Sequence, residues 1–145
     1  GCRRGELLKL QWSNVHIANK YLTVKNSLSK NRKTIHKPLN HAAIQSLLAL
    51  KLDNNSDWVF FNHDTGNRRV TFQKGFKKAV DLAGLGNVRI HDLRHTFASI
   101  LVQNGTPLYH VMQLLGHSDI KTTQKYAHLS NSNLQNVVNS IPIFD

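Results

Sequence analysis

A histidine and a tyrosine near the end of the chain are spaced so that they could act on a phosphate group. His117 follows an apolar run that ends at Gly116, and Tyr126 comes nine positions after His117. A tyrosine hydroxyl can act as a nucleophile, but its ordinary pKa of about 10 means that cations or a base must help it to ionise. We therefore interpret Tyr126 as a candidate nucleophile toward a phosphodiester, which would need cationic groups from elsewhere in the chain.

Groups suited to that reaction occur at three other places. They are Arg3, a basic stretch that holds Lys30, Arg32, Lys33 and Lys37, and the pair His91 and Arg94. Attack on a phosphodiester builds negative charge on the nonbridging oxygens, which the planar, permanently charged fork of an arginine stabilises. A lysine near the leaving oxygen could donate the proton that the alkoxide needs. This scheme requires no metal and no other cofactor.

The charge balance favours a polyanionic partner. The 145 residues include 19 Lys and Arg against 8 Asp and Glu, which gives a formal net charge of +11. Each phosphate that a protein neutralises releases condensed counterions, so this surplus favours nucleic acid over a basic surface kept for solubility. The length fits one compact domain with its own core.

Cysteine content and hydropathy point to an intracellular protein. Cys2 is the only cysteine, so no intramolecular disulfide can form. No apolar run approaches the roughly 20 residues of a membrane span, and no signal peptide is present. We expect no membrane partner. The sequence lacks an initiator Met and opens directly into a helical pattern, so it reads as a fragment of a longer protein.

The first part of the chain predicts a helix followed by a small sheet. Leucines within residues 4–10 are typical of a short helix, and Arg3 stands at its entrance, where free backbone N–H groups attract anions. Apolar and polar residues alternate between residues 14 and 39, with turn residues at 18–20 and 30–32. This period of two predicts about three antiparallel strands, with the basic stretch at the second hairpin.

The rest of the chain predicts helices. Asn40 can cap a helix that carries Ile44, Leu47 and Leu48 on one face. Further helices are expected at residues 72–83, residues 91–103, from Thr106-Pro107 to Leu115, through Tyr126, and from Asn133 to Ile141. In the helix over residues 91–103 we expect four residues to face the core: Leu93, Phe97, Ile100 and Leu101. The predicted fold class is α+β, mainly α, with helices packed on a small three-stranded antiparallel sheet near the N-terminus.

Three segments resemble the signature boxes of the tyrosine recombinases, the phage-integrase family. GCRRGELLKLQW resembles the first arginine box, HDLRHTFAS the His-x-x-Arg box, and LLGHSDIKTTQKYAH the box that holds the nucleophile. Their order and spacing agree with the family over nearly the whole chain. The resemblance implies one integrase-like catalytic domain over residues 1–145, truncated at its N-terminus and without the family's N-terminal DNA-clamping domain.

The resemblance also implies a function and partners. The function is site-specific DNA recombination, the integration or excision of a mobile element, by strand cleavage and rejoining through a 3′-phosphotyrosyl intermediate. The partner is double-stranded DNA, bound by a homo-oligomer, a tetramer. The expected localisation is cytoplasmic, for a bacterial or phage protein associated with the nucleoid.

Roles for single residues follow from the resemblance. Arg3 and Arg94 would clamp the phosphate, and Glu6 would brace the site. His91 would contact the phosphate and handle protons, while His117 would donate to the scissile phosphate.

The remaining roles concern the nucleophile, the general acid and one neighbour. Tyr126 would attack and free a 5′-hydroxyl. Counting back from Pro38-Leu39 selects Lys30 as the catalytic lysine, with Lys33 as the runner-up. His95 belongs to the second box and is expected to be structural.

Three alternatives stay open at this point. A type IB topoisomerase-like protein would relax one duplex with the same tyrosine chemistry, although the short chain and the LGHSDIKTTQKYAH pattern favour the recombinase. A DNA-binding module without catalysis would not need Tyr126 at its fixed spacing from His117. A zinc site at His91 and His95 is disfavoured, because HExxH is absent and Arg94 would repel the metal.

Overall fold

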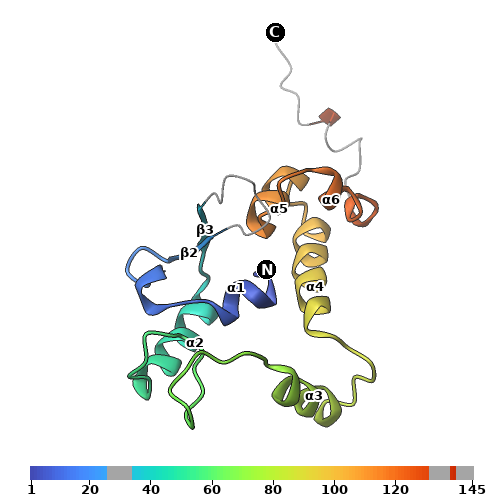
Figure 1. Cartoon of the computed structure of the whole chain (residues 1–145). Coiled ribbons are helices and arrows are strands. Elements are labelled where there is room, and N and C mark those ends of the chain that lie inside the picture. Colours follow the sequence, from blue (N-terminus) through green and yellow to red (C-terminus); the bar gives the residue numbers. More distant parts are fainter. Residues whose placement is uncertain (26–33, 131–137, 140–145) are drawn as a thin grey trace. The chain divides into compact units, whose positions relative to one another are not determined.

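The computed structural model describes residues 1–25, 34–130 and 138–139 (Figure 1). They belong to two compact units, one formed by Cys2–Arg94 and the other by Gly1 with His95–Asp145. The predicted Lys30 and Lys33 lie outside the described residues. The predicted tail helix also lies outside them, except at Val138 and Asn139.

The Cys2–Arg94 unit contains the sheet. Its elements are α1 (Arg4–Leu8), the 3-10 helix η1 (Trp12–Asn14), β1 (Val15–His16), β2 (Tyr21–Lys25), β3 (Thr34–Pro38), α2 (His41–Leu52), α3 (Gln73–Leu82) and the start of α4 (Ile90–Gln103). The three strands are antiparallel in the order β1-β2-β3. The predicted first turn is present, where Lys20 adopts a positive φ of 56°.

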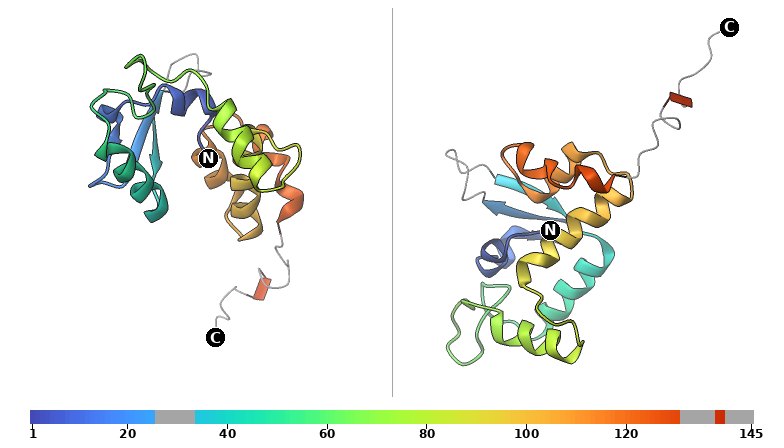
Figure 2. Two further views of the ribbon diagram at one scale, coloured as in Figure 1. Left: turned by 90° about the horizontal axis from the view of Figure 1, so that it is seen from below. Right: turned by 90° about the vertical axis from the view of Figure 1, so that its right-hand side faces the viewer.

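The register of the strands decides which side chains enter the core of this unit. Leu22 pairs with both Val15 and Lys37, and Val24 pairs with Ile35. Because side chains alternate between the two faces of a strand, these residues share one face. The core on that face contains Leu10, Leu22, Val24, Leu47 and Val59, so Leu47 packs α2 against the sheet. Figure 2 shows α2 beside the strands. Lys37 therefore points toward the core side.

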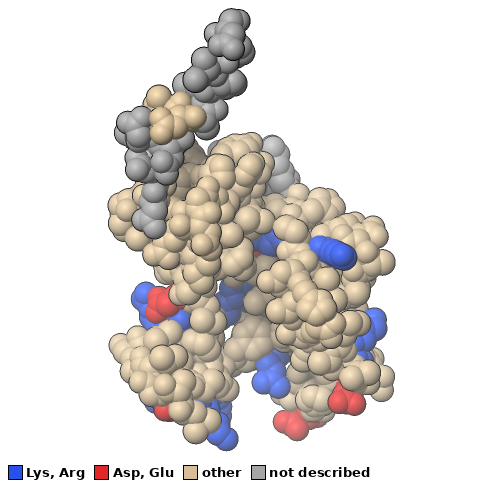
Figure 3. Space-filling view, turned by 180° about the vertical axis from the view of Figure 1, so that it is seen from behind, with Lys and Arg blue, Asp and Glu red and all other residues tan. Residues whose placement is uncertain are grey.

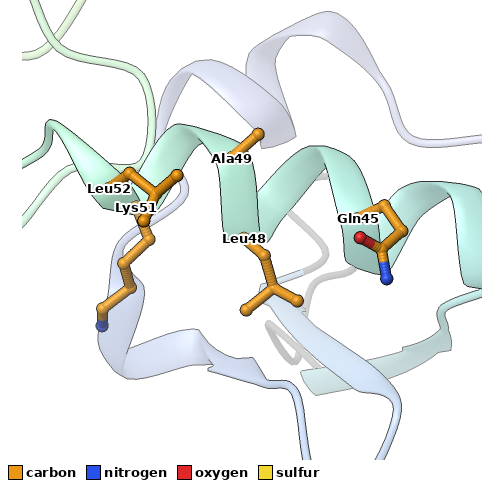
Figure 4. A pocket seen from close by; sticks show the side chains of 5 residues that line it. All are labelled: Gln45, Leu48, Ala49, Lys51 and Leu52. Carbon is orange, nitrogen blue, oxygen red and sulfur yellow. The ribbon is translucent and has the colours of Figure 1, made fainter.

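Helix α2 begins as predicted but buries less of its apolar surface than expected. The Asn40 side chain accepts a hydrogen bond from the Ala43 N–H at 2.9 Å, which confirms the predicted cap. Only Leu47 is buried, whereas Leu48, which was expected on the same face, is exposed. Its side chain lines a shallow surface pocket on α2 with Gln45, Ala49, Lys51 and Leu52 (Figure 4).

The second unit is helical in the part that the structure describes. It comprises the rest of α4, then α5 (Leu108–Leu115), α6 (Lys121–Gln124) and the 3-10 helix η2 (Ala127–Leu129). Helix α5 ends, as predicted, at Gly116, whose φ of 70° suits a residue without a Cβ. The core of the unit is formed by Ala98, Val102, Val111, Leu115 and Tyr126.

The predicted core face of α4 is wrong at two of its four positions. Leu93 and Ile100 are exposed, with relative accessibilities of 55% and 51%. The buried residues of α4 are Arg94, Ala98 and Val102, which recur at every fourth position and form one stripe. Ala98 has no bulk beyond its Cβ, so the backbone of α4 can approach its neighbours closely along this stripe.

The class of the fold is as predicted, a mainly helical α+β arrangement with one small three-stranded antiparallel sheet. Within the described ranges, no helix combines the length and the apolar character that crossing a membrane would require.

Candidate active site

Arg3 is held in place by Glu6 at the start of α1. The Arg3 backbone N–H donates to Glu6 Oε2 at 2.8 Å, and its Nη1 donates to Oε1 at 3.0 Å. An acidic residue at the third position of a helix commonly receives such a bond from the residue before the helix. Here the same carboxylate also orients the guanidinium. This arrangement supports the predicted bracing role of Glu6.

A second cation, Lys37, reaches the same carboxylate from β3. Its Nζ lies 3.7 Å from Glu6 Oε2, and both side chains are almost completely buried. Burial lowers the pKa of Lys37, Cys2 and Glu6 oppose this shift, and the positive charges of Arg94 and Arg3 add to it. Lys37 thus stays inside the unit because Glu6 compensates its charge.

Arg94 belongs to this group of charges. It is buried on the first turns of α4, and its charge acts on both Lys37 and Cys2. Burial raises the pKa of the Cys2 thiol, while Lys37 acts in the opposite direction. Arg3 and Lys37 thus meet at the carboxylate of Glu6, and the charge of the buried Arg94 acts on Lys37 within the same unit. Such a group attracts an anion with two nonbridging oxygens.

The start of α4 is fixed by an exposed ion pair. Asp92 Oδ2 accepts from the Arg89 N–H at 2.9 Å, and its Oδ1 lies 2.9 Å from Arg89 Nη2. This interaction joins the residue before the helix to its first turn. His91 lies on the same first turn and is exposed.

Tyr126 lies in the second unit, in a turn and not on a helix. The prediction of a helix through Tyr126 is wrong, because α6 ends at Gln124 and η2 begins at Ala127. The Tyr126 N–H donates to the Thr123 carbonyl at 3.0 Å, which closes a tighter turn than an α-helix has. The side chain is only 6% exposed and belongs to the core of the unit. Its hydroxyl lies 2.6 Å from Nδ1 of His95.

His117 is oriented by a residue for which the sequence predicted no role. Its Nδ1 lies 2.8 Å from Oγ1 of Thr123, which is fully buried. Because the two nitrogens lie on different sides of an imidazole, a hydrogen bond through Nδ1 directs Nε2 away from Thr123. Nε2 is then the nitrogen that can donate to a phosphate.

The structure brings the predicted residues together in two groups. Arg3, Glu6 and Arg94 join Lys37 in the Cys2–Arg94 unit, and His117 and Tyr126 lie with Thr123 and His95 in the other unit. Among the described residues there is no group of three or more His, Cys, Asp or Glu side chains that could hold a metal ion.

Sequence reasoning missed two members of these groups. The burial of Lys37 could have been read from the period of two, because Lys37 follows Ile35 on the same side of its strand. For Thr123, we find no such signal beyond its place inside the box of the nucleophile.

The sequence of the chain matches a known protein family. The model of the Phage integrase family matches residues 1–133. Tyrosine recombinase XerD of Brucella suis biovar 1 is 36% identical over 146 residues, which cover 95% of this chain and 47% of that protein. The chain thus spans about half the length of that relative.

Solved structures agree with this match. The catalytic domain of bacteriophage HP1 integrase has a TM-score of 0.71 at 27% identity, over 97% of this chain and 75% of that one. The site-specific recombinase XerH, bound to a palindromic difH substrate in a post-cleavage complex, has a TM-score of 0.74 at 26% identity, over 96% of this chain and 42% of that one. These neighbours confirm the predicted fold. Since the family model covers most of its length, the chain belongs to the phage integrase family.

Proposed function

We propose that the protein recombines DNA at specific sites by cleaving and rejoining strands through a 3′-phosphotyrosyl intermediate. The observation that carries this proposal is the group of three cations in the Cys2–Arg94 unit: Arg3 and Lys37 contact the carboxylate of Glu6, and the charge of the buried Arg94 acts on Lys37. In a chain of this family, that group suits the phosphate that Tyr126 would attack.

The cleavage step follows from the chemistry of these groups. Arg3 and Arg94 bind the nonbridging oxygens and stabilise the charge that builds on them. His117 donates from Nε2 to the same phosphate. The Tyr126 oxygen forms a bond to phosphorus as the bond between phosphorus and the 5′-oxygen breaks. Lys30, which lies outside the described residues, donates a proton to that leaving oxygen.

Rejoining reverses this step with a different strand. The energy of the phosphodiester is kept in the phosphotyrosyl bond, so no nucleotide cofactor is needed. A 5′-hydroxyl from the second duplex attacks the phosphorus, and the tyrosine leaves. Two duplexes with two strands each need four nucleophiles, and one copy of the chain supplies one Tyr126. We therefore propose a homo-oligomer, a tetramer on DNA.

Double-stranded DNA as the partner is supported by charge. The formal net charge is +11, and on the face drawn in Figure 3 lysine and arginine cover more surface than aspartate and glutamate. Lys74, Lys77 and Lys78 are exposed together along α3, where helical spacing places them on one side. The similarity to XerH, whose structure contains its difH substrate, agrees with this partner.

The proposal is tested by trapping the intermediate. The full-length protein, given a nicked duplex that carries its own recombination site, is expected to form a protein–DNA adduct that survives denaturant. Tyr126→Phe should abolish the adduct and leave DNA binding intact, because only the nucleophilic oxygen is removed. An adduct of unchanged yield with Tyr126→Phe would overturn the assignment. A recombinase yields products that join strands of two duplexes, whereas a topoisomerase only relaxes one duplex, so the products distinguish the two.

The α3 lysines yield a separate prediction about DNA affinity. Replacing Lys74, Lys77 and Lys78 with Gln is expected to weaken binding and to reduce the slope of log affinity against log salt by roughly 0.9 for each phosphate that the variant no longer neutralises. Asp81→Asn on the same helix should strengthen binding slightly. Fluorescence anisotropy over a salt series measures both effects. An unchanged slope in the triple variant would exclude α3 from the interface.

A further inference from the structure

The hydroxyl of Tyr126 has an imidazole partner that is neither His91 nor His117. Nδ1 of His95 lies 2.6 Å from the Tyr126 oxygen, and the two ring centroids are 5.9 Å apart at an angle of 50°. A nucleophile and its base must lie within about 2.6–3.2 Å of each other for direct proton transfer. This pair meets that requirement before any DNA is bound.

We propose that His95 is a further catalytic residue, the base that accepts the proton of the Tyr126 hydroxyl during strand cleavage. This inference rests on the proposed function and adds one proton transfer to it. As the tyrosine oxygen bonds to phosphorus, its proton moves to Nδ1 of His95. The 5′-oxygen separately takes its proton from the general acid. When the strand is rejoined, His95 returns the proton to the departing tyrosine.

The surroundings of Tyr126 favour this role. The side chain is 6% exposed, so bulk water has little access to the hydroxyl as an acceptor. The His95 imidazole, by contrast, is an acceptor already within hydrogen-bond distance of the hydroxyl. On the ring itself, Nζ of Lys125 lies 5.1 Å from the centroid, and this cation favours negative charge on the phenol as the proton leaves.

The direction of the hydrogen bond follows from ordinary protonation states. A phenol with a pKa of about 10 keeps its proton near neutral pH and can donate it. A neutral imidazole carries one N–H and accepts at its other nitrogen. If Tyr126 donates to Nδ1, His95 carries its own proton on Nε2. A His95 that is protonated on Nδ1 could not act as this base.

The first experiment reads this protonation state without DNA. In the full-length protein labelled with ¹⁵N-histidine, Nδ1 of His95 is expected to give the signal of a nonprotonated nitrogen at neutral pH. Tyr126→Phe should shift that signal because it removes the hydrogen bond, and His95→Asn identifies the resonance. A protonated Nδ1, or a signal that Tyr126→Phe leaves unchanged, would overturn the inference.

The second experiment separates a base from a structural partner. The Asn side chain can place its amide near the position of Nδ1 and accept the hydrogen bond, but it cannot take the proton. His95→Asn is therefore expected to slow adduct formation by roughly 10²–10⁴-fold, the range of general acid–base catalysis. His95→Ala should be at least as slow. Wild-type rates in His95→Asn would show that the histidine only holds the ring in place.

A substrate with sulfur in place of the bridging 5′-oxygen shows which proton transfer His95 serves. A thiolate leaves without a general acid, so this substrate should restore cleavage by Lys30→Ala but not by His95→Asn. Rescue of His95→Asn would assign His95 to the leaving group and contradict the proposal. If the wild-type protein forms no adduct with either substrate, the proposed function itself fails, and this role falls with it. Adduct formation by the wild type together with a protonated Nδ1 rejects the role of His95 alone.

Discussion

Glu6→Gln is expected to lower the free energy of unfolding by about 3–5 kcal/mol, the range found when one partner of a buried ion pair is removed. The Glu6 carboxylate contacts both Lys37 and Arg3 within the Cys2–Arg94 unit, and the Glu6 and Lys37 side chains are almost completely buried. Glutamine keeps the shape but not the charge, so Lys37 would remain as a buried cation beside two arginines. Chemical denaturation of the full-length protein measures the change.

The matched control removes the other partner as well. Lys37→Met replaces the buried cation with an apolar chain of similar length, and Glu6→Gln with Lys37→Met should be less destabilised than the sum of the single variants. Strictly additive effects would show that the 3.7 Å pair carries no coupling.

The same variants separate stability from catalysis. Glu6 also fixes the guanidinium of Arg3, and a misplacement of about 1 Å at a catalytic group can slow a reaction by 10²-fold. We expect cleavage by Glu6→Gln to fall on that order, and the added Lys37→Met substitution to recover stability without recovering the rate. Cleavage at the wild-type rate in the double variant would mean that Arg3 does not depend on Glu6.

The pH dependence of stability gives a check on the buried lysine. The pKa of Lys37 is lowered in the folded protein, so between this value and the usual lysine value of about 10.4 the unfolded chain binds more protons at this site. The stability that Lys37 contributes must therefore rise with pH through that window. As the pH rises through that window, the free energy of unfolding of the protein with Lys37 should increase relative to that of Lys37→Met. Both proteins should also carry Cys2→Ala, because the Cys2 thiol would otherwise titrate as well. Chemical denaturation at a series of pH values measures the difference.

Much of the fold and part of the site were predictable because local patterns determine them. The alternation of apolar and polar residues predicted the three strands. Asn40 predicted the start of α2, and Gly116 marked the end of α5. These features depend on the conformational preferences of single residues and on spacing along one element.

The errors came from features that depend on interactions between distant segments. Helical spacing on α4 allows more than one stripe of residues to face the core. The stripe that is buried includes Arg94, a charged residue that a search for apolar positions passes over. Lys37 was interpreted as part of a basic hairpin because nothing local to β3 reveals that Glu6, from α1, compensates its charge. The hydrogen bond of His95 with Tyr126 joins residues 31 positions apart, so no local pattern could predict it.

Thr123→Val is expected to slow DNA cleavage on the order of 10²-fold while changing stability by only about 1 kcal/mol. Valine keeps the shape of this fully buried residue but removes Oγ1, the partner of His117 Nδ1 at 2.8 Å. The imidazole is then without the hydrogen bond that directs its Nε2 away from Thr123. Single-turnover cleavage measures the rate, and denaturation measures the stability. DNA affinity should stay near the wild-type value, because Thr123 is buried and presents no charge to DNA.

Thr123→Ser is the control that keeps the hydrogen bond and changes only the packing. Serine keeps the hydroxyl and lacks a buried methyl group, which costs about 1 kcal/mol or somewhat more once the cavity is included. Cleavage should remain near the wild-type rate because the bond to His117 can still form. If Thr123→Val and Thr123→Ser slow cleavage equally, packing and not the hydrogen bond explains the effect. If Thr123→Val cleaves at the wild-type rate, His117 does not need this hydrogen bond, and its ring must be oriented by other groups. The two variants together therefore test whether a residue that never touches DNA sets the geometry of one that does.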